Sequence, residues 1–338
     1  MNVSQMTISK QVGVSRSAVS HVLNGRGHMV SAETRKRIEE ALNANGYHRN
    51  ALVRALKENR THVIGIIVPS GGLSFFTEII DAAENQASAH GLQCFLCQTH
   101  SRLDVLEKEL NALREYRVDG VLIIPSSSTA FPQVYRNLAK QKFPFVIADV
   151  PIDGLKTAYV GNDNACAGRL AAEHLLGLGH RRIAFIRGYH ESLTARDRLA
   201  GFEQALKKAK VPLDPTLICG DGFTFEQGCS SVAELLKNKT KFTALVASSD
   251  FAALGAIQEL SGRGLRVPED VSIIGCGNLD FSAMITPSLS TINQNPQILG
   301  CEAINALVKQ IEGKTKNVCR IMVPPELIAR KSTAPLKA

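Results

Sequence analysis

One face of a short predicted helix near the N-terminus carries a row of small polar and cationic side chains. With about 100° between successive residues of a helix over 15–23, this outward arc contains no acid. Its members are Arg16, Ser17, Ser20, His21 and Asn24. A guanidinium can donate two hydrogen bonds to a guanine edge, an imidazole can bond to a purine edge, and short side chains let a helix enter a major groove. These side chains are therefore suited to recognising bases rather than to making or breaking covalent bonds.

Two helices and a tight turn are needed to hold that face in place. Ser4 can cap a first helix over residues 5–11, and Ser15 can cap the second helix, which runs to about Leu23. Gly13, in the corner between them, can take the positive φ that such turns often require. The inward arc of the second helix is apolar and consists of Ala18, Val19, Val22 and Leu23. This spacing favours a helix–turn–helix unit, and the alternative is a helical hairpin whose polar face meets only water.

A third helix completes a small head, and the head is basic. Ser31 can cap this helix, Gly46 suits its C-cap, and its buried stripe consists of Ile38, Ala41 and Leu42. Residues 1–60 carry ten basic and four acidic side chains, a net charge of +6, whereas the other 278 residues hold only +2. A basic head on a nearly neutral body is typical of a nucleic-acid-binding module; a solvated charged surface is the alternative.

Residues 48–60 join this head to the rest of the chain. Asn50 could cap a helix of two turns, which is marginal when it is alone in water. The segment sets apolar residues beside basic ones, namely Leu52, Val53 and Leu56 beside Arg54 and Lys57. We expect it to fold only against DNA and a partner copy, with Leu56 wedged between base pairs in the minor groove. A solvated linker is the alternative.

Length and composition exclude several other classes of protein. At 338 residues the chain is longer than one hydrophobic core usually serves, so we expect two or three domains. It shows neither an apolar stretch long enough to span a membrane nor an N-terminal signal, so we expect a cytoplasmic protein. Of eight scattered cysteines, only Cys94 and Cys97 form a CxxC pair, inside an apolar run that predicts a strand. We therefore expect reduced thiols, no metal and no cofactor, with redox or metal chemistry as the alternative.

From residue 61 onward, predicted strands and helices alternate. Residues 63–68 form a nearly continuous apolar run, as expected for a parallel strand that is buried on both faces. Helices are predicted over 75–90, 105–116 and 198–208, and further strands over 92–97, 120–124, 183–186, 244–247 and 271–274. These repeated βαβ units predict two doubly wound α/β subdomains. Because open parallel sheets bind ligands beyond the carboxyl ends of their strands, we expect a ligand cleft between the two sheets.

Candidate ligand contacts lie where predicted strands end and in the loops beside them. They include two aromatic rings that could cover a sugar or a base, one arginine and several short polar side chains. The set is Phe75, Asp149, Ser192, Thr194, Arg198, Phe223, Asp250 and Asn278. A carboxylate at a strand end often only caps a helix, and an arginine can be a plain ion-pair partner, so these alternatives stay open for each residue.

Several of these runs resemble one known family. They are ISKQVGVSRSAVSHVLNG over 8–25, VSAETR over 30–35, Gly46-Tyr47, NALVRALK over 50–57 and PPELIARKST over 324–333. Over essentially its whole length, the chain resembles the LacI/GalR-type (lactose/purine repressor) family of bacterial transcription regulators. The resemblance implies an α/β protein with an all-α helix-turn-helix headpiece and a two-lobed periplasmic-binding-protein-like body of two doubly wound parallel sheets.

The resemblance also implies a function and its contacts. A homodimer would bind double-stranded operator DNA of near-palindromic sequence as a repressor, and a small molecule such as a sugar would act as effector. From the residue patterns and the resemblance together, we expect DNA contacts from Ser4, Ser15, Arg16, Ser17, Ser20, His21, Asn24, Asn50, Arg54, Leu56 and Lys57. Among the strand-end candidates, the resemblance supports Phe75, Asp149, Arg198, Phe223 and Asp250 as effector contacts.

The chain departs from the family pattern near three of the strand ends. Gly277 stands where the family often has an acid that contacts the effector, Ser249 where it has Asn, and Leu73-Ser74 where it has Asn-Pro. An effector of different shape is therefore expected, and its identity is left open. The sequence also leaves open whether the effector releases or promotes DNA binding.

Two other classes of protein are weighed against a regulator. An enzyme is not expected, since the GxGxxD run over 275–280 lacks the third glycine of a dinucleotide site and no catalytic set can be proposed. A solute-binding protein of the periplasm would need an export signal and would lack the basic head. We expect a headpiece over 1–48, a hinge and linker over 49–60, a first lobe over 61–162 with about 292–319, and a second over 163–291 with about 320–332.

Overall fold

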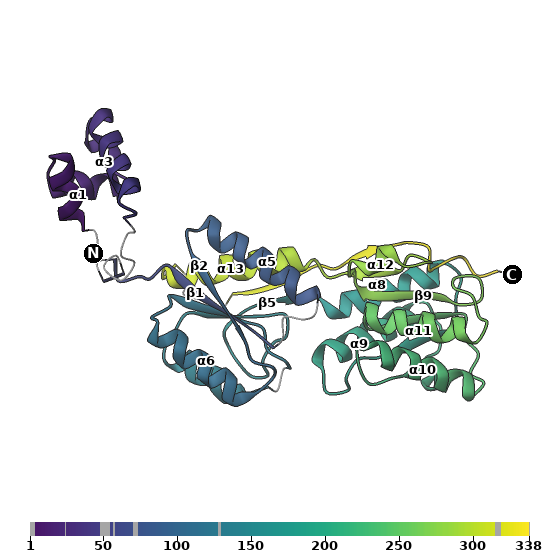
Figure 1. Ribbon diagram of the computed structural model, residues 1–338. Helices are drawn as coiled ribbons and strands as arrows, with labels where there is room; N and C mark the ends of the chain where they lie inside the picture. Colours follow the sequence, from purple (N-terminus) through teal and green to yellow (C-terminus); the bar gives the residue numbers. More distant parts are fainter. Residues whose placement is uncertain are drawn as a thin grey trace. The chain divides into compact units, whose positions relative to one another are not determined.

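The computed structural model describes residues 4–23, 25–47, 55–56, 58–69, 74–127, 130–314 and 319–337 (Figure 1). The chain divides into two compact units, Met1–Thr61 and His62–Ala338. Each unit has its own hydrophobic core, and each is described by itself.

The first unit is a bundle of short helices. They are α1 (Gln5–Val12), α2 (Arg16–Leu23), the 3-10 turn η1 (Gly27–Met29) and α3 (Ala32–Ala44). One side chain from each α-helix, Ile8, Val19 and Ile38, is completely buried in a common core. The caps expected from the sequence are confirmed, since Ser4 and Ser31 accept hydrogen bonds from backbone N–H groups three residues ahead.

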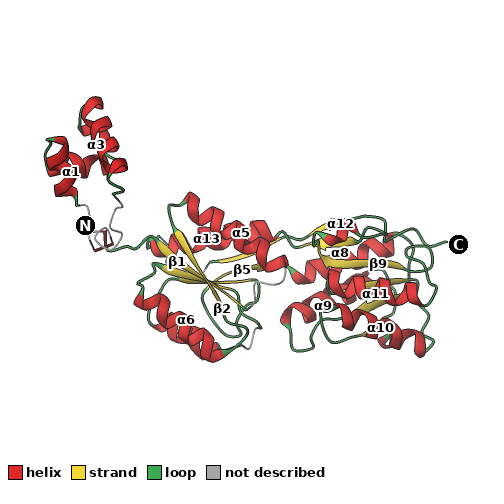
Figure 2. Ribbon diagram, in the orientation of Figure 1, coloured by secondary structure: helices red, strands yellow, loops and turns green. Residues whose placement is uncertain are grey.

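The second unit contains two six-stranded sheets. The strands of the first sheet are all parallel and run in the order β11 (Arg320–Val323), β5 (Ala158–Asn162), β4 (Phe145–Ala148), β3 (Gly120–Ile123), β1 (Val63–Val68) and β2 (Gln93–Gln98). Helices α5 (Ser74–Ala89) and α13 (Pro296–Ile311) cover one face, and α6 (Leu103–Glu115) and α7 (Pro132–Lys140) cover the other (Figure 2).

The second sheet has the same design with one reversed strand. Its order is β12 (Glu326–Ile328), β10 (Ser290–Asn293), β9 (Ser272–Gly277), β8 (Ala244–Ala247), β6 (Ile183–Ile186) and β7 (Ile218–Cys219). Only β12 is antiparallel to its neighbour among the described pairs. Helices α8 (Asn164–Gly177) and α9 (Leu193–Lys208) cover one face, and α10 (Phe225–Lys237) and α11 (Asp250–Gly262) cover the other. Two doubly wound lobes, as expected from the sequence, are therefore confirmed.

The points at which the chain passes between lobes differ from the expected ones. Strand β10 still pairs with β9, so the second lobe continues to residue 293 rather than ending at 291. Strand β11 pairs with β5 of the first sheet, which corrects the assignment of residues 320–323 to the second lobe. Both differences arise because pairing across the sheet, which a local pattern does not reveal, decides where a strand belongs.

The CxxC pair is part of the core. Cys94 and Cys97 are three residues apart on β2, so their side chains point to opposite faces of the sheet and join different hydrophobic clusters. Burial raises the pKa of Cys94 to about 11 and that of Cys97 to about 12. A disulfide between them is excluded by this geometry, and the described residues hold no cluster of ligating side chains for a metal. No described helix has the length and apolarity to cross a bilayer.

Helices α8 and α9 approach closely enough to require glycine. A Cβ atom on Gly168 would lie 1.8 Å from the carbonyl oxygen of Arg198, and one on Gly201 would lie 1.8 Å from that of Ala165. The two backbones are therefore in contact, and α9 is held directly against the helix beneath it.

We expect Gly168→Ala to lower the free energy of unfolding by about 1–3 kcal/mol, because the added methyl must push the helices apart. Gly177→Ala, in the same helix but with open space around the added Cβ, is the matched control and should leave stability unchanged or slightly raised. Denaturant titration of both variants measures the difference. Equal stabilities would show that the helices separate without cost.

Candidate nucleic-acid interface and ligand site

The caps of the first unit fix the direction of its polar helix face. The Ser15 Oγ accepts from the backbone N–H of Ala18 at 3.1 Å and lies 2.8 Å from the Ser17 Oγ. Gly13 between the helices has φ of 73°, the left-handed conformation expected from the sequence. Arg37 of α3 donates to the carbonyl oxygen of Val12 at 2.6 Å, which ties the third helix to this corner.

The exposed face of α2 matches the predicted arc as far as the structure describes it. Arg16 and Ser17 are exposed, and Ser20 and His21 are half-buried, while Val19 on the opposite arc is completely buried. No carboxylate forms an ion pair with Arg16 in the described part of the chain. The guanidinium is therefore available to an external acceptor.

Four predicted DNA contacts, Asn24, Asn50, Arg54 and Lys57, lie outside the described residues. Leu56 is described, and its side chain is 77% exposed. An isolated leucine with so much of its surface in water gains nothing from the fold around it. The wedge role expected for Leu56 stays a prediction.

At the end of the first sheet, Asp149 is held with its carboxylate buried. Its φ is 63°, its backbone N–H donates to the Val160 carbonyl at 2.9 Å, and Tyr159 Oη donates to its carbonyl at 2.8 Å. No described group donates a hydrogen bond to the carboxylate itself, which belongs to a residue only 7% exposed. Burial raises the pKa of Asp149 to about 6, against the opposing effect of the positive charge on Arg198.

At the end of the second sheet, Arg198 extends a buried guanidinium from α9. Its Nε donates to Asn164 Oδ1 at 3.0 Å, and one terminal nitrogen donates to the Ser248 carbonyl at 2.5 Å. Its central carbon lies 5.9 Å from the centre of the Phe223 ring, within reach of a cation–π contact. These partners leave further N–H groups of the guanidinium for a ligand.

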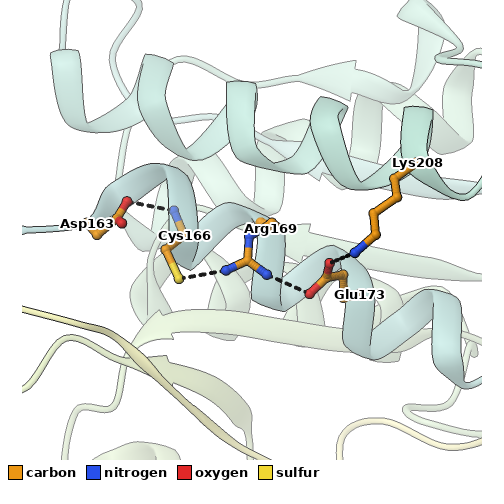
Figure 3. Close-up of polar contacts among 5 residues, drawn as sticks. All are labelled: Asp163, Cys166, Arg169, Glu173 and Lys208. Carbon is orange, nitrogen blue, oxygen red and sulfur yellow. Dashed lines mark hydrogen bonds and ion pairs between the residues drawn. The ribbon is translucent and has the colours of Figure 1, made fainter.

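The start of α8, which carries Asn164, is fixed by a row of polar contacts (Figure 3). Asp163 caps the helix by accepting from the Cys166 backbone N–H at 2.9 Å, and Arg169 donates to the Cys166 sulfur at 3.1 Å. Arg169 also pairs with Glu173 at 2.8 Å, and Lys208 of α9 reaches the same carboxylate at 3.4 Å. The two helices that supply Asn164 and Arg198 are thus joined by charge as well as by close packing.

Among the aromatic and hydroxyl candidates, Phe223 is the residue that the described contacts place beside Arg198. Phe223 is half-buried, packs edge-on to Tyr189 at 5.6 Å between ring centres, and lies so close to Gly188 that a Cβ there would be 2.1 Å from the ring. Ser192 caps α9 by accepting from the Ala195 N–H at 3.4 Å. Thr194 in the same first turn is half-buried. Phe75 is also half-buried and lies 5.8 Å from Phe76 between ring centres.

Two predicted ligand contacts are instead engaged within the protein. Asp250 is 0% exposed, and its carboxylate accepts from Thr291 Oγ1 at 2.6 Å, Ser282 Oγ at 2.7 Å and the Leu279 N–H at 2.9 Å. This carboxylate ties the strand ends of the second sheet together, which corrects its assignment to the ligand. Its hydrogen-bonding capacity is largely used inside the core.

Asn278 is held in a similar way. Its Oδ1 accepts from Arg330 at 2.6 Å, and its backbone N–H donates to Thr291 Oγ1 at 3.2 Å. The φ of 56° at this residue turns the chain out of β9. These bonds occupy the amide oxygen of Asn278, and its role as a ligand contact stays a prediction.

The structure adds polar residues that the sequence analysis missed. Asn162 is 2% exposed, and neither its Oδ1 nor its Nδ2 has a partner in the described structure; the Ser248 Oγ is buried and unpaired in the same way. A buried polar atom without a partner costs about 1–3 kcal/mol. Asn162, at the end of β5, could have been found by the strand-end rule that found Asp149. Such atoms indicate a place where a polar ligand belongs.

Asp149 lies near enough to Arg198 for the guanidinium charge to act on its carboxylate, and Ser248, whose carbonyl accepts from Arg198, also has an unpaired hydroxyl in the described structure. Such an arrangement can hold an uncharged molecule by donating to it from Arg198 and accepting from it at Asp149.

Comparisons with known proteins match both the helical first unit and a large part of the second unit. The model for bacterial regulatory proteins of the lacI family matches residues 6–50, and the model for the periplasmic binding protein-like domain matches residues 172–333. The HTH-type transcriptional repressor PurR of Pasteurella multocida is 35% identical over 326 residues, covering 96% of this chain and 97% of the relative.

Solved structures of two regulators are also similar over almost the whole chain. The lac repressor dimer bound to operator and the anti-inducer ONPF matches with a TM-score of 0.86 and 26% identity, covering 99% of this chain and all of that one. The complex of the transcriptional regulator CelR with cellobiose has a TM-score of 0.75 and 29% identity, covering 98% and 99%. These relatives are regulators and not enzymes, in agreement with the expectation from the sequence. The chain belongs to the LacI/GalR family of bacterial transcription regulators.

Proposed function

We propose that this chain is a cytoplasmic repressor that binds a near-palindromic operator as a homodimer and responds to a small molecule at the strand ends of its two lobes. The observation that carries the DNA-binding half is the exposed, acid-free face of α2 on a folded helix-turn-helix unit. The relatives are named for repression and, in one case, for a dimer on its operator. A homodimer places two such faces in successive major grooves.

On the operator, the residues of the first unit divide into two groups. Arg16 and Ser17 in the first turn of α2 and His21 in its last turn read base edges, and Asn24 follows on the same arc. Ser4, Ser15 and Ser20 stand at helix starts or on the same side, where backbone N–H groups and hydroxyls suit phosphate oxygens. The Ser4 and Ser15 hydroxyls also accept the cap hydrogen bonds that hold these helix starts in place.

The hinge, residues 50–57, couples the two units. Asn50, Arg54 and Lys57 provide polar and cationic contacts, and the exposed Leu56 enters the minor groove when the segment folds on DNA. Folding of so short a helix needs the contacts that operator and partner copy supply. An effector can therefore act by changing whether this segment folds into a helix.

The effector occupies the site around Asp149 and Arg198. Phe75 and Phe223 cover the faces of a ring, Ser192 and Thr194 add hydroxyls, and the unpaired atoms of Asn162 supply a donor and an acceptor. The two opposite charges already balance, so the ligand is uncharged and rich in hydroxyl groups. A sugar or sugar derivative fits this chemistry, and cellobiose in the CelR complex is such a molecule.

Regulation follows from a change in the angle between the lobes. An effector that binds one lobe arrangement more tightly shifts the populations of the two arrangements. Linked binding sites of this kind typically have a coupling free energy of about 1–3 kcal/mol. The preferred arrangement determines whether the two hinge segments of the dimer can order on the operator.

We expect Arg16→Ala to relax base preference at one position in each half-site, with a loss of about 1–3 kcal/mol for the preferred base. Selection from random duplex DNA, followed by sequencing of the bound pool, measures this preference. Lys10→Ala, a change at an exposed cation outside the α2 face, is the control and should weaken all sequences alike. An unchanged preferred sequence for Arg16→Ala would contradict the assignment.

Leu56→Ala should weaken operator binding while effector affinity stays unchanged, because the wedge acts only on DNA. Leu56→Met keeps an apolar side chain of similar volume and should retain most of the affinity. Fluorescence anisotropy with the selected operator gives the DNA affinities, and calorimetry gives those for the effector. Equal operator affinity for Leu56→Ala and the parent chain would remove Leu56 from the interface.

Arg198→Met should abolish the effector response while operator affinity in the absence of effector stays intact. A thermal-shift screen against sugars, sugar acids, nucleosides and purines first identifies a ligand, since binding raises apparent stability. Arg196→Met, an exposed neighbour on the same helix, is the matched control. A response that survives in Arg198→Met would place the effector elsewhere.

A further inference from the structure

Positive charge is concentrated at the amino ends of the strands in the second lobe. Three segments lead into β6, β7 and β8, namely residues 178–182, 207–217 and 237–243. Together they contain eight lysines and arginines and one carboxylate, a net charge of +7, compared with +8 for the whole chain. This edge is opposite the carboxyl ends at which the proposed effector site lies.

The favourable interaction of cations with helix C-termini explains the position of only some of these side chains. Lys207, Lys208 and Lys237 lie in the last turns of α9 and α10, where a cation is favourable. The other five cations lie beyond the helix ends and are Arg181, Arg182, Lys210, Lys239 and Lys241. Of these five, only Arg182 pairs with a carboxylate among the described residues, at 3.2 Å from Asp214.

The Arg182–Asp214 pair forms a ridge between two hollows in this edge. Arg182 Nε also donates to the Lys241 carbonyl at 2.7 Å, and Asp214 accepts from Thr216 Oγ1 at 2.6 Å, so the ridge is firmly held. The hollow on one side has a volume of 870 Å³ and includes Lys239 and Lys241. The hollow on the other side has a volume of 610 Å³.

The smaller hollow combines cations with an apolar lining. Arg181 and Lys210 contribute charge, and the loop that follows Lys210 contributes Val211, Pro212 and Leu213. Leu213 is 41% exposed. An unpaired cation calls for an anion, whereas an exposed leucine gains from an apolar partner.

We propose that this basic edge docks an acidic segment of a partner protein, in which an apolar side chain is flanked by carboxylates. Carboxylates would pair with Arg181, Lys210, Lys239 and Lys241, and the apolar side chain would cover Leu213. Nucleic acid matches less well, because its evenly spaced phosphates offer nothing to the apolar lining. The proposal is independent of the effector site and of the DNA-reading face.

The test uses the full chain and a short fluorescein-labelled peptide of glutamates around two central leucines. Fluorescence anisotropy at physiological salt compares the parent chain with the double variant Arg181→Glu, Lys210→Glu. The matched control is Lys10→Glu, Arg26→Glu, two exposed cations of the first unit. We expect the first variant to lose about tenfold or more in peptide affinity and the control to keep it.

A second comparison separates the apolar contact from charge alone. Leu213→Ser should remove the preference for the leucine peptide over one with serines in place of the leucines, while thermal unfolding stays near that of the parent. Two results would overturn the proposal. One is peptide binding that Arg181→Glu, Lys210→Glu leaves unchanged; the other is a loss of duplex DNA affinity in that variant equal to its loss of peptide affinity, which would indicate a nucleic-acid surface.

Discussion

The proposed ligand site depends on the need to satisfy a buried guanidinium. Arg198 enters the protein from α9, and a charge removed from water is tolerated only where hydrogen bonds and an opposite charge receive it. Asn164 and the Ser248 carbonyl provide the bonds, and Asp149 provides the charge. The geometry requires α8 and α9 to touch, which Gly168 allows. A small residue in a helix interface thus sets the position of a cation at the strand ends.

The proposed DNA-reading face depends on the opposite condition, a cation left without an acidic partner. Within the described residues Arg16 has no acidic partner, whereas Arg35 on α3 is paired with Glu39 at 2.7 Å. An exposed pair of this kind contributes little to stability, so its absence at Arg16 costs the fold little. The first unit can therefore keep one helix face ready for an external acceptor while its small core, centred on Ile8, Val19 and Ile38, holds the helices together.

The features that could be predicted from the sequence are those set by neighbours along the chain. Ser4 and Ser31 were predictable because a cap bonds three residues ahead, and Asp149 because polar residues follow parallel strands. Asp250 follows the same rule yet serves the core, since its partners, Thr291 and Ser282, arrive from segments far along the chain. Strand β11 was misplaced for the same reason, because its partner β5 is distant in sequence. Local sequence patterns locate polar groups. Contacts between segments that are distant in the sequence decide which of these groups keep unused hydrogen-bonding capacity.

This distinction also restricts what an effector must do. Asp149 belongs to the first lobe and Arg198 to the second, and each has hydrogen-bonding capacity that the described protein does not use. A ligand that contacted only one of them would bind both lobe arrangements equally well and would shift neither population, however tight its binding. A ligand that bridges them gains differential contacts, because the distance between the two groups changes with the lobe angle. The proposed effector would therefore reach both, with an acceptor for the guanidinium at one end and a donor for the carboxylate at the other.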